Sequence, residues 1–157
     1  MKGKIVLLLF VCLAGLTGCS DQALIDENQA IENSTWSNKQ VREFTATVKD
    51  VRVPYHVYLN VRNSMEYSFS NLSVLFRQIN PDKSTKTHRI NVIMADKEGL
   101  WVGKGTGNLY AQQVQFLKNY HFPDTGTYTF QIEHNMRLDP LVGITDIGLR
   151  IAPVSPE

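Results

Sequence analysis

The sequence predicts an all-β protein: an antiparallel two-sheet β-sandwich of about seven strands, after a signal peptide and a short tether. Apolar and polar residues alternate with a period of two over most of the chain beyond Trp36, as expected for strands with one buried face. Turn residues separate these segments, and no long segment has the apolar spacing of a helix. A jelly roll and an immunoglobulin-like sandwich both fit this pattern.

The first residues have the layout of a secretory signal, because Lys2 and Lys4 are followed by an uncharged apolar run over 5–14. A bilayer span needs about 20 apolar residues, so this run is too short to be one. The segment 16–19, Leu-Thr-Gly-Cys, has the pattern of a bacterial lipoprotein box. We therefore expect residues 1–18 to be a signal peptide and Cys19 to carry fatty acyl chains such as palmitate; two chains give stable anchoring. The alternative is an ordinary signal peptide with an incidental cysteine.

Composition limits the classes of protein that fit. Loss of residues 1–18 would leave 139 of the 157 residues, which suits one domain. Without Lys2 and Lys4 the 16 basic residues fall to 14 against 15 acidic ones, a net charge near −1, which argues against nucleic-acid binding. Cys12 lies in the signal segment, so an acylated Cys19 leaves no thiol for a disulfide, a zinc site or a nucleophile.

The segment 19–38 is polar and weakly patterned, which favours a lipidated N-terminus and tether that lifts the domain off the bilayer. The alternative is a segment partly docked through Leu24 and Ile25. Ser20 follows Cys19, whereas an aspartate there favours inner-membrane retention in bacterial lipoproteins, so we expect the outer membrane. The β-sandwich domain is then expected over 39–153, with a C-terminal tail over 154–157.

The expected strands are separated by turns that include Pro81-Asp82 and the segment 123–126. Residues 114–117 alternate too little to exclude a short helix. In chain order the strands are expected over 44–48, 55–61, 72–76, 90–94, 115–122, 128–132 and 147–151.

No catalytic or metal-binding pattern emerges from the polar residues. Two metal ligands from one strand require His-x-His spacing, which is absent, so the histidines are expected to be exposed or hydrogen-bonded. A Gly-x-Ser-x-Gly nucleophile turn is also absent. Asp124 and Glu133 could be proposed as a glycosidase pair, but only their proximity in the sequence supports it. We therefore expect no enzyme, no cofactor and no metal. The histidines are His56, His88, His121 and His134.

The glycine-rich segment 103–107, Gly-Lys-Gly-Thr-Gly, superficially suggests a phosphate loop, but no helix pattern follows it. A tight hairpin in which Trp101 packs on the sandwich is the favoured interpretation. Several aromatic residues could stack on sugars or on a partner protein, or belong to the core. They are Trp36, Tyr67, Phe69, Trp101 and Tyr110.

Short motifs spread over nearly the whole mature chain carry a family resemblance. They include Pro-Tyr at 54–55, the segments 59–63 and 67–72, Met-Ala-Asp at 94–96, 99–105, 122–123 with 126–130, Met-Arg at 136–137, and 143–151. Together with the lipoprotein box they resemble the gliding motility lipoprotein family GldH. The resemblance implies a cell-envelope lipoprotein of the gliding apparatus that is linked to type IX secretion, without catalytic residues. Only Cys19 carries over as a functional position.

The leading hypothesis is a non-catalytic lipoprotein, held in the membrane by the lipid on Cys19, that anchors or stabilises other envelope motility or secretion lipoproteins. An exposed strand face of His56, Tyr58, Asn60 and Arg62 could make these contacts, although it is equally an ordinary solvated side. The alternative is a surface glycan-binding sandwich, because such folds often stack aromatic side chains on sugar rings.

Overall fold

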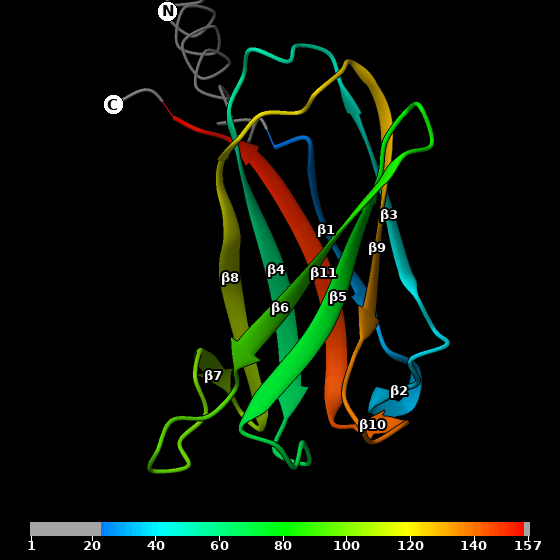
Figure 1. Cartoon of the computed structure of the whole chain (residues 1–157). Coiled ribbons are helices and arrows are strands. Elements are labelled where there is room, and N and C mark those ends of the chain that lie inside the picture. Colours follow the sequence, from blue (N-terminus) through cyan, green and yellow to red (C-terminus); the bar gives the residue numbers. More distant parts are fainter. Residues whose placement is uncertain (1–22, 156–157) are drawn as a thin grey trace, which may run out of the picture.

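Alternating apolar residues build two large antiparallel sheets that pack face to face in the computed structural model, which describes residues 23–155 (Figure 1). Apart from strands, the described chain contains a short 3-10 turn, η2, at Glu32–Ser34. No helix within these residues is long and apolar enough to cross a bilayer. The strands are β1 Ile25–Ala30, β2 Thr35–Trp36, β3 Arg42–Val48, β4 Tyr55–Ser64, β5 Asn71–Ile79, β6 Thr85–Ile93, β7 Lys104–Thr106, β8 Leu109–Tyr120, β9 Gly126–His134, β10 Leu141–Val142 and β11 Ile144–Pro153.

The strands form a five-stranded sheet in the order β1-β11-β4-β8-β7, a four-stranded sheet in the order β3-β9-β5-β6, and a small sheet of β10 and β2. All seven expected segments coincide with strands, although β6 ends at Ile93 and β8 at Tyr120, and residues 114–117, for which a short helix had remained open, lie in β8. The expectation of about seven strands in two sheets was nevertheless too low, because the described residues hold eleven strands and a third, small sheet. β2, β7 and β10 are two or three residues long and too short to show alternation.

The order of the long strands is that of a jelly roll. Consecutive long strands cross from one large sheet to the other, except β5 and β6, which form a hairpin within the four-stranded sheet. An immunoglobulin-like sandwich would join more of its consecutive strands as hairpins within one sheet. This topology brings the two ends of the domain together, since β1 pairs with β11.

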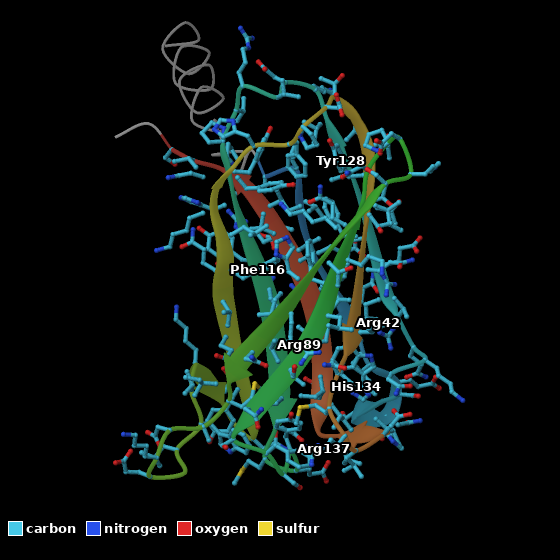
Figure 2. All side chains as sticks on the ribbon, viewed as in Figure 1. Arg42, Arg89, Phe116, Tyr128, His134 and Arg137 are labelled. Atoms are coloured by element: carbon cyan, nitrogen blue, oxygen red, sulfur yellow. The ribbon has the colours of Figure 1, made fainter. Side chains whose placement is uncertain are left out.

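The core lies between the two large sheets and follows the predicted alternation. In β4, Tyr55, Val57, Leu59 and Val61 are buried, and the residues between them are more exposed. Phe116 of β8 packs edge to face on Phe76 of β5 with ring centroids 4.9 Å apart, which joins the sheets at the middle of the sandwich. Figure 2 shows the labelled Phe116 in this central region and Tyr128 nearer the end of the molecule from which the C-terminus leaves.

The expected tether is wrong from Leu24 onward, because this segment belongs to the sandwich. The backbone N–H of Leu24 donates to the carbonyl of Ile151 over 2.8 Å, and β1 then pairs with β11 along its whole length. Trp36 is fully buried, and its Nε1 donates to the carbonyl of Gln40 over 3.0 Å. The interpretation in which the segment docks through Leu24 and Ile25 is therefore correct. A polar edge strand is held mainly by backbone hydrogen bonds, which leave no apolar pattern in the sequence.

The signal peptide 1–18, Cys19 and the part of the expected tether before residue 23 lie outside the described residues. At the other end, β11 ends at Pro153, the expected domain boundary, and Val154 N–H donates to the Pro54 carbonyl over 2.9 Å. The last two residues of the expected tail also lie outside the described part.

Candidate functional site

The outer face of the five-stranded sheet carries the polar side chains that alternation predicts for β4. His56, Tyr58 and Asn60 are half-buried and Arg62 is exposed, while the residues between them point into the core. Pairing with β11 and β8 on either side surrounds this row with further outward side chains. The exposed strand face expected from the sequence is therefore present and lies at the centre of a sheet.

A groove of about 670 Å³ is hollowed into this face. Its floor includes Asn60 and Arg62 of β4, and β1 and the β7–β8 hairpin line its two sides. This volume lies within the range of roughly 300 to 1,000 Å³ that is usual for ligand sites. Other polar residues of the lining include Asp26 and Asn28 from β1, Asp146 from β11, Lys104 from β7, and Gln112 and Gln113 from β8.

Cross-strand pairs fix the polar groups of the groove. Arg62 Nη1 lies 3.4 Å from Oδ2 of Asp146, its register partner on β11. Arg150 forms an ion pair with Asp26 in the same way between β11 and β1. The charges of the basic and acidic side chains therefore nearly cancel over the groove, which carries no large excess of positive or negative charge.

The carboxamides of the groove form a second cross-strand set. Gln113 Nε2 donates to Asn60 Oδ1 over 2.8 Å, and the two residues are register partners on β8 and β4. Asn28 lies beside Gly148 of β11, where an added Cβ would meet the Asn28 side chain and lie 2.6 Å from the Glu27 carbonyl oxygen. Glycine at this position lets β1 and its Asn28 side chain approach the floor closely.

The four histidines lie apart from one another. His56 is on the outer face and accepts from Asn119 N–H over 3.3 Å, and His121 lies in the exposed loop after β8. His88 of β6 packs against Phe76, and burial, with the charge of Lys86, lowers the pKa of its imidazole. Within residues 23–155 no group of three or more His, Cys, Asp or Glu side chains is arranged to hold a metal.

His134 is fully buried, and its Nε2 lies 3.2 Å from Oδ1 of Asp139. Figure 2 shows it at the end of β9 close to the β2–β10 sheet. Its ring meets that of Trp36 edge to face with centroids 5.2 Å apart. Hydrogen bonding is thus the correct interpretation for this histidine.

Asp124 and Glu133 do not form a catalytic pair. Asp124 precedes the first residue of β9 and Glu133 is next to its last, so a strand rise of about 3.3 Å per residue separates them by more than 20 Å. Glycosidase carboxylates lie within about 10 Å of each other. The glycine-rich segment forms the expected hairpin of β7 and β8, in which Gly107 takes a φ of +64° at the turn.

The five aromatic residues noted in the sequence do not form one exposed surface. Trp36 and Tyr67 are core residues, with 0% and 2% of their surface exposed. Trp101 and Tyr110 are half-buried against each other, with ring centroids 6.0 Å apart. Phe69 packs edge to face on Tyr67. The five residues therefore do not form a single sugar-stacking surface.

Sequence reasoning missed the groove residues outside β4. Asp146 and Gln113 are far from Asn60 and Arg62 in the chain, and only strand register brings them together. Asp26 and Asn28 were assigned to the tether. The polar residues at alternate positions of β11 and β8 were the available signal, but alternation alone does not say which strands are neighbours.

A family model described as GldH lipoprotein matches residues 23–151, almost all of the described chain. The chain belongs to the GldH lipoprotein family. It is 27% identical over 158 residues to the gliding motility lipoprotein GldH of Flavobacterium johnsoniae, a match that covers 96% of both chains. It is 26% identical over 142 residues to a GldH homolog of Christiangramia forsetii, with 86% of each chain covered.

Two solved structures resemble this GldH-family fold at low scores. A carbohydrate-binding module, CBM28, specific for non-crystalline cellulose matches with a TM-score of 0.47 at 5% identity, covering 83% of this chain and 73% of that one. The insecticidal δ-endotoxin Cry8Ea1 of Bacillus thuringiensis matches with a TM-score of 0.38 at 14% identity, covering 83% of this chain and 20% of that one.

In this GldH-family chain, the groove has the chemistry of a binding surface. Its carboxylates are engaged in ion pairs with arginine, and its amides and Lys104 offer hydrogen bonds toward the open side. Asn60, Arg62, Gln113 and Asp146 stand on central strands of a packed sheet, which holds them in place, and Asp26, Asn28 and Lys104 stand on its two edge strands.

Proposed function

We propose that this protein is a non-catalytic, lipid-anchored component of the gliding motility machinery and of the type IX secretion linked to it. Removal of residues 1–18 leaves an acylated Cys19 that holds the protein in the cell envelope, at the outer membrane. There it anchors or stabilises other envelope components, including motility or secretion lipoproteins. The observation that carries this proposal is the preformed polar groove on the outer face of the five-stranded sheet, in a chain of the GldH lipoprotein family.

The position of β1 supports a domain held close to the membrane. An extended chain spans at most about 3.5 Å per residue, so Cys19 lies within roughly 20 Å of Leu24, where pairing with β11 begins. β1 also forms one side of the groove. The same segment that leads from the anchor therefore shapes the contact face, and the groove stands within reach of other membrane-bound components.

Anchoring is tested by metabolic labelling with an alkyne fatty acid, followed by membrane fractionation. The wild-type protein is expected to be labelled and to sediment with the outer membrane, whereas Cys19→Ser is expected to be unlabelled and released. Mass spectrometry that finds an unacylated sulfur at Cys19 in the native protein would contradict the anchor.

The contact face is tested by co-purification of the tagged protein after mild detergent extraction, with a gliding assay of the same cells. The variant Arg62→Glu/Lys104→Glu reverses two charges of the groove and is expected to lose envelope components and motility. Arg89→Glu, on exposed β6 of the other large sheet, is the matched control and is expected to keep both. A wild-type protein that purifies alone in several detergents would remove the basis of the proposal.

A further inference from the structure

We propose that the groove on the outer face of the five-stranded sheet binds a neutral, polyhydroxylated ligand: a stretch of an envelope glycan chain. This rests on the proposed function, in which the same face contacts envelope components, and names the chemical class of one of them. The site is the groove between β1 and the β7–β8 hairpin.

The charge of the groove selects a neutral ligand. Asp26 and Asp146 bring two carboxylates to the lining, and both are paired with arginine. An anionic ligand would meet these carboxylates, and a cationic one would meet Arg62 and Lys104. A ligand without net charge can accept hydrogen bonds from the basic side chains and donate them to the carboxylates. It does not have to displace an existing ion pair.

The hydrogen-bonding groups match hydroxyls. Each carboxamide offers a carbonyl acceptor and an NH₂ donor, and each hydroxyl can donate and accept. The Asn28 side chain has no hydrogen-bond partner within residues 23–155. The bond from Gln113 to Asn60 uses Nε2 of the first and Oδ1 of the second, which leaves the Gln113 oxygen and the Asn60 NH₂ for a ligand. Lys104 adds a cationic donor from the side.

The groove floor does not suit an extended peptide. Peptides that add to a sheet need a strand edge with unpaired backbone groups. The floor strands β11 and β4 are each paired on both sides, so their backbone groups are already used. Apolar lining side chains are few and small, Val102 and Ala111 among them, which leaves little for the side chains of a peptide.

The half-buried aromatic residue Tyr58 lies next to one end of the polar set, outside the groove lining, and its ring meets that of His56 edge to face. Tyr58 is the next outward residue after Asn60 on β4 and pairs in register with Arg150 and Gln115. Outward residues on one strand are about 6.5 Å apart, a spacing that places an aromatic ring beside the carboxamides. An amphipathic aromatic ring next to fixed polar groups can pack on the C–H face of a sugar while its hydroxyls bind the amides.

The test uses the full mature chain carrying Cys19→Ser, so that neither acyl chains nor sugar-based detergents interfere. The probes are neutral hexasaccharides of glucose, mannose, galactose, xylose and N-acetylglucosamine on an array, with polygalacturonate as the acidic comparison. Binding to at least one neutral probe, measured again by titration calorimetry, is expected. Asn60→Ala/Gln113→Ala is expected to weaken it at least tenfold.

The matched control is Thr45→Ala/Thr129→Ala, a polar cross-strand pair on the outer face of the four-stranded sheet, which is expected to bind like the parent. If the Asn60/Gln113 variant loses its fold by circular dichroism, Asn28→Ala replaces it and is expected to weaken binding as well. No binding to any neutral probe, binding only to polygalacturonate, or unchanged affinity in the folded groove variants overturns the inference.

Failure here and failure of the proposed function are distinguishable. A protein that binds no glycan on the array but is acylated, supports motility and co-purifies with envelope components would overturn only the glycan ligand. If the protein binds glycan but is unacylated and dispensable for motility, the proposed function is overturned and the glycan-binding site in the groove still stands.

Discussion

His134 Nε2 lies 3.2 Å from Oδ1 of Asp139, and this contact joins the end of β9 to the loop before β10. The same carboxylate accepts from the backbone N–H of Asn38 over 2.9 Å and from the hydroxyl of Ser37. Because His134 also packs on buried Trp36, polar and apolar contacts hold the turn after β2 against the loop before β10.

Asp139→Asn is expected to flatten the dependence of stability on pH in acid. The hydrogen bonds from Asn38 N–H, His134 and Ser37 hold the pKa of Asp139 below its usual value near 3.8. A carboxyl whose pKa is lower in the folded state stabilises the fold above the unfolded pKa, and this contribution is lost as pH falls through the folded pKa. Urea unfolding at several pH values between 6 and 2.5 measures the effect. Identical slopes for both proteins would contradict it.

Trp36→Ala is expected to lower the free energy of unfolding by about 3 to 5 kcal/mol, because it removes a fully buried indole and leaves a cavity. The loss is measured by chemical denaturation. Trp101→Ala, which truncates a half-buried indole, is the control and is expected to cost clearly less. A loss at Trp36 no larger than the loss at Trp101 would contradict the larger contribution of the fully buried indole.

Gly148→Val is expected to separate β1 from β11 and to destabilise the domain by about 1 to 3 kcal/mol. The new Cβ would lie 2.6 Å from the carbonyl oxygen of Glu27, a backbone atom that cannot turn aside. Hydrogen exchange should accelerate over Ile25–Ala30 and remain slow in β9. Ala152→Val, on the same face of β11 opposite His56, is the control. Unchanged protection of β1 would refute the close approach.

Gln78 and Tyr120 are expected to show an energetic coupling of about 1 kcal/mol in a double-mutant cycle. The buried Gln78 of β5 donates through Nε2 to the Tyr120 hydroxyl of β8 over 3.0 Å, which links the two large sheets. Gln78→Leu keeps the volume, and Tyr120→Phe keeps the ring that Lys86 Nζ approaches at 5.4 Å from its centroid. The exposed hydroxyl pair Thr47 and Thr127 provides a comparison cycle, whose coupling should be smaller. Additive effects at Gln78 and Tyr120 would contradict the link.

Alternation was sufficient to find the main strands and to say which residues of each face the core. In β4 the buried set of Tyr55, Val57, Leu59 and Val61 and the outward set beginning with His56 both follow from the period of two. Turn chemistry placed the breaks between strands. The segment around β1 and β2 was misjudged, because backbone pairing and a single buried indole leave no periodic signal.

By itself, the sequence determined the all-β class and the faces of the predicted strands, and it carried the pattern that predicts lipidation at Cys19 and the resemblance to GldH lipoproteins. Only the tertiary structure decided the jelly-roll order, the inclusion of β1, and the meeting of Arg62 with Asp146 and of Asn60 with Gln113 in one groove. The physical reason is that side-chain periodicity is a local property of each strand. Which strands become neighbours, and in which register, depends on backbone hydrogen bonds between segments distant in the chain.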